Sequence, residues 1–485
     1  MKNSESSSTA NSGKSDRISR RDFVRGAAAA AAAFTIVPRY VLGGPGHTPP
    51  SEKLNVAAVG IGGQGKKDIL DVGGFELTRE GAIIPKDTPG ENIVALCDVD
   101  DEYAASVFEQ FPKAKRYRDY RKMLEQQKDI DAVVIATPDH SHAVIAMAAM
   151  QLGKHVYVEK PLTHSVHEAR MLTEAARKYK VATQMGNQGH SGEGARLVCE
   201  WIADGAIGNV SEVHAWTNRP IWPQGIDRPT DKPPVPNTLD WDLWIGPAPK
   251  RSFHPLYHPR FWRGWWDFGC GALGDMACHV LDPAFWALKL ENPVAVEACA
   301  SHYARMVKGG KWGSIEERTD SFPRASIVRY EFAARDGRGP VKVSWYDGGM
   351  KPERPAELEA GRPLEQDESS GFIRGDKGII RYSQYGGSPR IIPESNMKAY
   401  KLPPKTIARV ETSHQQDWVQ ACKGGVAACS NFDYSGPFTE MVLLGNIALR
   451  FPGQRLEWDS KNMKVTNLPE ANKYVRRQYR SGWSL

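Results

Sequence analysis

A short apolar stretch that runs directly into a glycine-rich turn constrains the fold of this chain more than any other feature. Residues 53–59 are typical of a buried β-strand, and a helix is predicted over 66–72. Between them stand Gly60, Gly62 and Gly65 in the spacing G-x-G-x-x-G, and this strand–turn–helix context gives an otherwise weak motif its meaning. The three glycines permit a tight turn, close approach of a pyrophosphate, and close packing of helix on strand. The pattern therefore predicts a dinucleotide-binding unit.

A second predicted strand, residues 93–97, ends in the acidic residue Asp98. A carboxylate at this position accepts hydrogen bonds from ribose hydroxyls and repels a 2′-phosphate, which favours NAD(H) and leaves NADP(H) open as the second choice. Asp98 lies further from the glycines than the usual ~20 residues, and we interpret residues 73–91 as an insertion that explains the difference. The alternative is an ordinary acidic residue at the start of a loop.

The chain continues to alternate between strands and helices. The predicted elements are strands over 132–136, 155–158 and 181–185, and helices over 143–152 and 166–179. Such alternation predicts an α/β fold with a doubly wound parallel sheet, which we assign to residues 51–186 after a leader over 1–50.

The alternating apolar run over 155–158 is followed directly by Glu159, Lys160 and Pro161. Ligands of open parallel sheets bind beyond the carboxyl ends of the strands, so Glu159 and Lys160 are expected to face the crevice that holds a cofactor. Pro161 stops the strand and restricts Lys160 to extended backbone. A solvated surface ion pair is the alternative interpretation of this acid–base pair.

Residues 187–459 are predicted to form an α+β domain with a large, mainly antiparallel open sheet, because several β-rich stretches with turns occur over 295–382. The Pro- and Trp-rich stretch 219–260 is interpreted as a substrate-side loop rather than core. A helix is predicted over 438–451. No position is predicted for the basic residues 460–485 at the end of the sequence.

Asp275 and His279 are four residues apart in a predicted helix and so share one face of it. A histidine is a candidate proton-transfer group, because its unperturbed pKa lies close to physiological pH. Asp275 is a candidate to orient or charge-balance its neighbours. A structural Asp–His pair is the alternative.

Several of these motifs together resemble those of the Gfo/Idh/MocA family of nicotinamide-dependent sugar and polyol oxidoreductases. The motifs are the glycine loop, Asp98, T-P-x-H-x-H at 137–142 and G-K-H-V-Y-V-E-K-P at 153–161. The resemblance implies catalytic roles for Lys160, Asp275 and His279. The expected cofactor-binding residues are Gly60, Gly62, Gly65, Asp98, Thr137, Pro138, His142, Glu159, Lys160 and Gln188. Weaker substrate-side candidates are Asn187, His190 and Arg263.

The leader resembles a twin-arginine (Tat) export signal. Residues 19–23 read S-R-R-D-F, Arg25 follows, and an Ala-rich run over 26–37 is too short to span a bilayer. A basic amphipathic N-terminus is the alternative, but an alanine run has little apolar moment. We therefore expect the twin-arginine translocation machinery as a partner, a periplasmic location with the leader either cleaved or kept as a membrane tether, and a cofactor that is loaded before export and tightly bound.

The net charge and the cysteine spacing argue against nucleic acid and metal ions as partners. The net charge is +6, of which the leader supplies +4, so the body of the protein lacks the basic footprint expected of a nucleic-acid-binding protein. The seven cysteines show no metal-ligand spacing, so no metal is expected and the thiols are interpreted as unpaired. The resemblance also implies a homo-oligomer, either a dimer or a tetramer.

The sequence thus predicts an enzyme that transfers hydride between a sugar or polyol carbon and a nicotinamide, as in EC class 1.1.1. The first alternative is an NAD-dependent glycoside hydrolase or lyase that oxidises its sugar transiently, because some relatives in this superfamily are glycosidases of that type. The lesser alternative is a non-catalytic cofactor-binding protein.

Overall fold

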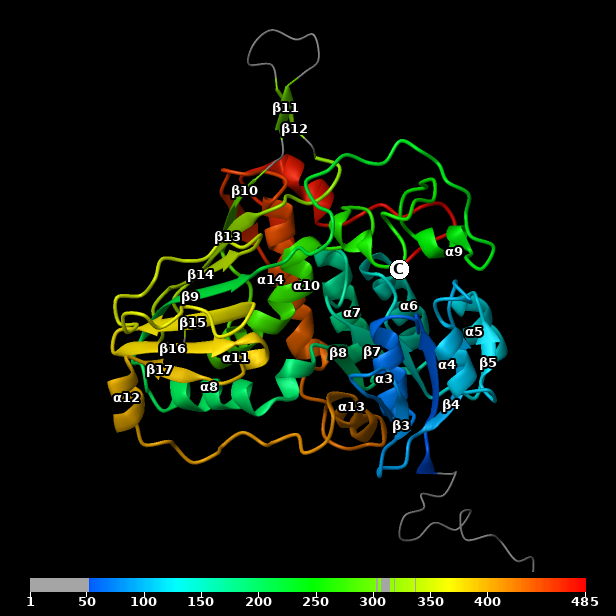
Figure 1. The fold of residues 1–485 in the computed structure, drawn as a ribbon, viewed down its shortest axis with the longest axis horizontal. Helices are drawn as coiled ribbons and strands as arrows, with labels where there is room; N and C mark the ends of the chain where they lie inside the picture. The colour runs from blue at the N-terminus through cyan, green and yellow to red at the C-terminus, as the bar shows by residue number, and fades with distance from the viewer. Residues whose placement is uncertain (1–51, 302–303, 307–314, 318, 336) are drawn as a thin grey trace, which may run out of the picture. The chain divides into compact units, whose positions relative to one another are not determined.

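Six parallel strands form the first sheet, in the order β5-β4-β1-β6-β7-β8 (Figure 1). The strands are β1 (Asn55–Val59), β4 (Asn92–Cys97), β5 (Lys115–Tyr117), β6 (Ala132–Ile135), β7 (His155–Glu159) and β8 (Thr183–Gly186). The strand order reverses between β1 and β6, which creates a crevice at their carboxyl ends. The predicted doubly wound parallel sheet is confirmed.

The computed structural model describes residues 52–301, 304–306, 315–317, 319–335 and 337–485. Residues 54–485 form one compact unit. The predicted export signal over 1–50 lies outside the described residues. None of the described helices is long and apolar enough to cross a membrane.

Five helices connect the parallel strands, and a short hairpin fills the predicted insertion. They are α3 (Gln64–Val72), α4 (Ala105–Gln110), α5 (Tyr120–Gln126), α6 (Asp139–Gln151) and α7 (Val166–Tyr179), with β2 (Phe75–Leu77) and β3 (Ile83–Pro85) in the hairpin. Helix α6 begins four residues earlier than predicted, directly after Pro138, which is its N-cap residue. Helix α7 begins with a capping box, in which the Ser165 side chain accepts from Glu168 N and the Glu168 side chain accepts from Ser165 N.

The second sheet has nine strands in the order β17-β16-β15-β9-β14-β13-β10-β18-β19. The strands are β9 (Val210–Thr217), β10 (Ala295–Ala300), β13 (Ser326–Phe332), β14 (Val341–Tyr346), β15 (Ser369–Gly375), β16 (Gly378–Ser383), β17 (Arg390–Ile392), β18 (Leu456–Asp459) and β19 (Lys464–Val465). Every neighbouring pair is antiparallel except β9 and β14. The predicted open, mainly antiparallel sheet is therefore confirmed. A separate hairpin pairs β11 (Ala304–Met306) with β12 (Ile315–Glu317).

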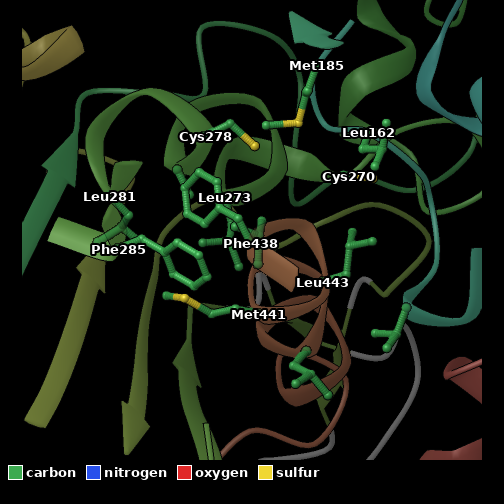
Figure 2. Packing of buried hydrophobic residues seen from close by; sticks show 14 of the residues in the cluster. Leu162, Met185, Cys270, Leu273, Cys278, Leu281, Phe285, Phe438, Met441 and Leu443 are labelled. Carbon is green, nitrogen blue, oxygen red and sulfur yellow. The ribbon is translucent and has the colours of Figure 1, made fainter. Parts of the chain in front are cut away.

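Helices α10 (Gly271–Val280) and α14 (Phe432–Ala448) pack on each other beside this sheet, and α14 also contacts α7 of the first domain. Figure 2 shows residues of the core cluster that they share, among them Leu273 and Cys278 of α10 and Phe438 and Met441 of α14. The predicted start of the last helix at residue 438 was wrong, because Asn431 caps a helix that continues through Pro437. The other helices are α8 (Glu193–Ala203), α9 (Trp241–Ile245), α11 (Asp282–Ala287), α12 (Glu394–Ala399) and α13 (His414–Cys422).

The Pro- and Trp-rich stretch 219–260 is not a simple loop. Trp241 and Trp244 stack with ring centroids 4.6 Å apart and belong to a small hydrophobic core that continues to Phe268. The backbone of this stretch is hydrogen-bonded to the first domain, because Asp240 N donates to Val99 O at 2.8 Å. The prediction that it lacks core character was wrong, because the aromatic side chains pack on one another. We call residues 219–268 the aromatic cap.

Candidate functional site

A cavity of about 340 Å³ lies at the carboxyl ends of the parallel strands. The strand ends, the aromatic cap and α10 enclose it. The glycine loop and Asp98, which follows β4, line one end of it. Lys160, which follows β7, and Asp275 and His279 of α10 line the other end. The fold therefore brings the two groups of residues singled out by the sequence, which lie far apart along the chain, into one cavity.

Lys160 and Asp275 form a buried ion pair. The Nζ atom of Lys160 donates to Asp275 Oδ1 at 2.7 Å and to the backbone oxygen of Asp275 at 2.9 Å. Arg263 Nε also donates to Asp275 Oδ1, at 3.0 Å. Two cationic side chains thus share one carboxylate, and the side chains of Lys160 and Asp275 are each only 12% exposed.

The charges of this pair are fixed by their mutual attraction. Burial lowers the pKa of Lys160, but the carboxylate of Asp275 outweighs it and the pKa lies above its ordinary value. Burial raises the pKa of Asp275, but Lys160 and then Arg263 depress it well below the usual range. At neutral pH Lys160 is therefore an ammonium that can donate a hydrogen bond, and Asp275 is its counter-ion.

His279 lies one helical turn after Asp275 and is almost completely buried. Burial, reinforced by the charge of Lys160, lowers its pKa to about 3, so the ring is neutral at physiological pH. Its Nδ1 atom is buried without a hydrogen-bond partner among the described residues. In this neutral form the ring has a free nitrogen that can accept a hydrogen bond or a proton, but its pKa lies below the range near neutrality in which a general base works best, so the unperturbed pKa expected from the sequence does not hold.

The opposite end of the cavity fits a dinucleotide. Gly60 has φ +80°, and a Cβ atom there would lie 2.7 Å from Thr137 N, so only glycine fits this turn. A Cβ atom at Gly65 would lie 1.9 Å from Gly60 O, where the loop packs on the start of α3. Two cavity-lining atoms, Thr137 Oγ1 and His258 Nδ1, are buried with no partner among the described residues. Unsatisfied buried polar atoms around a glycine cradle are what a nucleotide with several hydrogen-bonding groups requires.

Asp98 lines this end and also organises it. Its Oδ2 atom accepts from Ile61 N at 2.8 Å, in the glycine loop, and its Oδ1 atom accepts from Asp100 N at 3.0 Å. Burial raises the pKa of Asp98 despite these two bonds. The carboxylate therefore ties β4 to the glycine loop and is placed to meet a ribose.

Glu159 and Gln188 line the middle of the cavity and touch each other, with Gln188 Nε2 donating to Glu159 Oε1 at 2.7 Å. Burial raises the pKa of Glu159 to about 7, against the attraction of Lys160. Thr137 and Pro138 also line the cavity, whereas His142 does not. The ring of His142 bridges two backbone oxygens, those of Pro161 at 2.9 Å and Thr137 at 2.7 Å, so it supports the two loops rather than facing the cofactor.

The substrate-side candidates separate into two groups. Arg263 lines the cavity, but Asn187 and His190 lie outside its lining. Asn187 Nδ2 donates to Asp282 Oδ1 at 3.1 Å, and His190 Nδ1 lies 3.0 Å from the same carboxylate. Both residues are buried in this polar cluster. Because they come shortly after the end of β8, where ligands of a parallel sheet bind, the sequence could not distinguish them from site residues.

Other cavity-lining residues had no signal in the sequence. Tyr103 packs on Gly62, His258 of the aromatic cap lies 2.7 Å from Asp100 Oδ2, and the ring centroid of Tyr385 lies 4.8 Å from that of His279. Tyr385 has φ +64°, a left-handed backbone that is costly for a tyrosine and is often found where function holds a side chain in place. These residues come from three distant segments, so only the folded chain shows that they belong together.

Asp139, the first residue of α6, also lines the cavity, and its Oδ2 atom accepts from Cys270 N at 3.0 Å. Burial raises its pKa to about 7, against the attraction of Arg263 and Lys160. From about pH 4, where the unfolded carboxyl ionises, to pH 7 the folded group retains its proton. In this window the folded state binds more protons than the unfolded state, so the contribution of Asp139 to stability falls as pH rises.

We expect Asp139→Asn, which cannot titrate, to remove this dependence. The stability of the variant relative to the unaltered protein should rise by roughly 1–3 kcal/mol between pH 5 and pH 8, because over this range the buried carboxyl of the unaltered protein loses its proton and the amide stays uncharged. Urea unfolding at both pH values measures the difference. A difference that is the same at pH 5 and pH 8 would contradict the assignment.

All seven cysteines are free. Cys97, Cys199, Cys270 and Cys278 are buried, and Cys299 is exposed. Within the described part of the chain, no group of three or more His, Cys, Asp or Glu side chains is placed to hold a metal ion.

Comparison with known proteins agrees with this geometry. Residues 54–187 match a family model described as the NAD-binding Rossmann fold of an oxidoreductase family, and residues 207–321 match its C-terminal alpha/beta domain. The chain is 28% identical to the levoglucosan dehydrogenase of Pseudarthrobacter phenanthrenivorans over 233 residues, which are 48% of this chain and 50% of that protein. It is 26% identical to a glycosyl hydrolase family 109 protein of Shewanella pealeana over 217 residues, 40% of this chain and 44% of that protein.

Among solved structures, the WlbA dehydrogenase from Bordetella pertussis, in complex with NADH and UDP-GlcNAcA, has the same fold with a TM-score of 0.55. The two are 18% identical, and the likeness covers 84% of this chain and 99% of that chain. These two curated relatives are each matched over half of their length or less. The two matched domains together span more than half of the present chain, which therefore belongs to the Gfo/Idh/MocA family of oxidoreductases.

Proposed function

We propose that this protein is an NAD(H)-dependent dehydrogenase that transfers hydride between a hydroxyl-bearing carbon of a sugar or polyol and the nicotinamide ring. One observation carries the proposal. The Lys160–Asp275 ion pair and the unsatisfied His279 meet at one end of a cavity whose other end is a glycine cradle followed by Asp98. The levoglucosan dehydrogenase relative supports the substrate class.

The cofactor supplies a carbon that accepts or returns hydride, and the chain supplies proton transfer and charge stabilisation. The ammonium of Lys160 donates a hydrogen bond to the substrate oxygen and stabilises the negative charge that develops there. The neutral ring of His279 takes the hydroxyl proton during oxidation and returns it during reduction. Asp275 keeps Lys160 charged and fixes its direction, because Lys160 donates to both the carboxylate and the backbone oxygen of Asp275.

The cofactor preference should respond to Asp98. Asp98→Asn keeps an oxygen that can accept from Ile61 N but removes the charge that repels a 2′-phosphate. We expect the ratio of NADP to NAD affinity to rise by roughly tenfold, about 1.4 kcal/mol. Titration calorimetry with both cofactors measures it, and the melting temperature of the variant monitors the glycine loop. An unchanged ratio in a folded variant would exclude Asp98 from ribose recognition.

The proposed reaction is tested on purified protein supplied with NAD and a panel of sugars, polyols and glycosides. Absorbance at the reduced-nicotinamide band should rise with at least one substrate, persist, and reverse on addition of the oxidised product. If no member of the panel changes the absorbance and no product forms, the dehydrogenase proposal fails.

A second candidate is glycoside cleavage through transient oxidation of the sugar. The similarity to a glycosyl hydrolase family 109 protein favours it. The same panel distinguishes the two, because release of an aglycone without lasting reduction of the cofactor indicates net cleavage, whereas lasting reduction indicates a dehydrogenase.

We also propose that the protein acts in the periplasm after export by the twin-arginine machinery. The support is the S-R-R-D-F motif followed by a short alanine-rich run. A reporter fused to residues 1–50 should be exported, and replacement of Arg20 and Arg21 by lysine should retain it in the cytoplasm. Export of the doubly substituted reporter at the normal level would contradict the proposal.

Assembly into a dimer or tetramer is a further part of the proposal and rests on the family to which the chain belongs. Sedimentation velocity over a range of concentrations measures it, and a monomer at all concentrations would exclude it.

A further inference from the structure

The last residues of the chain return to the nucleotide-binding domain. After the short 3-10 helix η5 (Pro469–Tyr474), residues 475–485, here called the C-terminal tail, run beside α6 and α9 to the end of the chain (Figure 1). This segment lies beyond the parts of the chain that match the family models. Its position therefore needs an explanation of its own.

The first anchor of the tail is the buried carboxylate of Glu168, which also closes the capping box of α7. Arg477 Nε donates to Glu168 Oε1 at 2.7 Å, and the Tyr479 hydroxyl donates to the same oxygen at 2.6 Å. Arg477 also donates to the backbone oxygen of His140 in α6. Because Glu168 is only 1% exposed, two charge-assisted bonds to it hold the start of the tail firmly.

The second anchor joins the tail to the aromatic cap. Arg480 N donates to Pro247 O at 3.0 Å, and its guanidinium donates to Gly246 O and to Asp242 O, both at 3.0 Å. The backbone then turns, with Trp483 N donating to Arg480 O at 3.1 Å. The tail is thus fixed to two different parts of the molecule, helices α6 and α7 at one end and the aromatic cap at the other.

This arrangement places Trp483 in the lining of the cavity. Its ring centroid lies 6.2 Å from that of Tyr120, and the guanidinium carbon of Arg121 lies 4.6 Å from the ring. Arg118 and Asp119, which follow β5, line the cavity beside it. Trp483 therefore lies at the β4–β5 side, away from Lys160 and α10.

That side is where the adenosine half of a dinucleotide belongs. In a doubly wound sheet of this order, the ribose acid follows the second strand of the first half, here Asp98 after β4, and the adenine lies beyond it. The catalytic residues lie on the other side of the switch point, after β7. An aromatic ring at the adenosine end offers a face or edge to a flat, apolar base.

We propose that Trp483 is a cofactor-binding residue, and that the C-terminal tail supplies an aromatic wall for the adenine ring. This inference rests on the proposed use of NAD(H) and extends it to a residue that belongs to no recognised sequence motif. The tail lowers the rate of cofactor release, because departure of the adenosine half requires the wall formed by Trp483 and Tyr120 to open. A cofactor so retained suits a protein that works where free nicotinamide nucleotides are scarce.

The test compares Trp483→Ala with Gln478→Ala, a matched control at an exposed position of the same tail. Binding of NAD, ADP-ribose and nicotinamide mononucleotide to the full chain, freed of bound nucleotide, is measured by calorimetry. Trp483→Ala should weaken NAD and ADP-ribose by roughly 5- to 100-fold, the range known for loss of a base-stacking aromatic residue. Nicotinamide mononucleotide, which lacks adenosine, should bind both variants as it binds the unaltered protein.

Equal affinity of the Trp483 variant and the unaltered protein for NAD would overturn the role of the tail and leave the proposed function standing. Equal weakening of all three ligands would overturn it too, since that result indicates a general effect on the fold. Trp483→Leu, which keeps apolar volume but removes the ring, gives the same test if the alanine variant does not fold. If the unaltered protein binds none of the nicotinamide ligands, the proposed function fails together with this inference.

Discussion

Replacing Lys160 by methionine is expected to abolish turnover while leaving cofactor affinity close to that of the unaltered protein. Lys160 is the ammonium at the reacting end of the cavity, and methionine fills similar space without a donor or a charge. Loss of a positioned acid–base and charge-stabilising group costs about 10²- to 10⁴-fold in kcat. The glycine loop and Asp98 lie at the other end, so the dissociation constant for NAD should change by less than about threefold, or 0.7 kcal/mol.

The fold should tolerate this change, because Asp275 keeps a second cationic partner in Arg263 at 3.0 Å. Lys178→Met, at an exposed position in α7, is the matched control and should behave like the unaltered protein. Stopped-flow measurement of hydride transfer checks the loss of turnover, and a separate titration with NAD checks that cofactor affinity is unchanged. Turnover of the Lys160 variant within tenfold of normal, about 1.4 kcal/mol of barrier, would refute the catalytic assignment.

The second large effect is expected for Asp275→Asn, which should lower both activity and stability. Without the carboxylate, Lys160 and Arg263, whose side chains are 12% and 30% exposed, lose the counter-ion to which both donate. The pKa of Lys160 then falls, because the attraction that outweighs its burial is lost. We expect kcat to fall at least about 100-fold, and the free energy of unfolding to fall by about 3–5 kcal/mol, as is usual when one partner of a buried pair is removed.

The pH of the stability measurement matters. The folded pKa of Asp275 is depressed, so its stabilising contribution is present above the unfolded pKa of about 4 and is lost as pH falls below that value. Urea unfolding at pH 7 therefore reports the full difference. At pH 3 the difference between variant and unaltered protein should shrink.

Asp267→Asn is the matched control for this prediction. Asp267 also pairs with two arginines, Arg228 at 2.9 Å and Arg251 at 2.8 Å, and its side chain is 14% exposed against 12% for Asp275. It does not line the cavity. The control should lose stability and keep its kcat, whereas equal loss of kcat in both variants would show that Asp275 acts only through the fold.

Much of the architecture could be predicted because it depends on local patterns. The continuous apolar run at 132–136 and the glycine spacing after residue 59 define a parallel sheet, since neighbours in sequence become neighbours in the sheet. Helix boundaries were less accurate near prolines. Helix α6 begins directly after Pro138, and α14 continues through Pro437, because capping and packing outweigh the loss of a hydrogen bond near a helix start.

The candidate site was only partly visible in the sequence. The sequence indicated Lys160, Asp275 and His279 individually, but the 2.7 Å contact between the first two required α10 to pack beside the end of β7. Asn187 and His190 follow β8 and looked like site residues, yet they turn into the polar cluster around Asp282. Both cases depend on side-chain direction, which no local pattern determines.

The sequence by itself therefore determined the α/β class, the glycine cradle and the acid after β4, because strand periodicity and turn chemistry are encoded locally. The tertiary structure alone decided the charge states of Lys160 and His279, the packing of the aromatic cap, and the return of Trp483 to the cavity. These depend on burial and on contacts between residues hundreds of positions apart, such as Arg477 with Glu168. Only the folded chain fixes which charges meet and which are shielded from water.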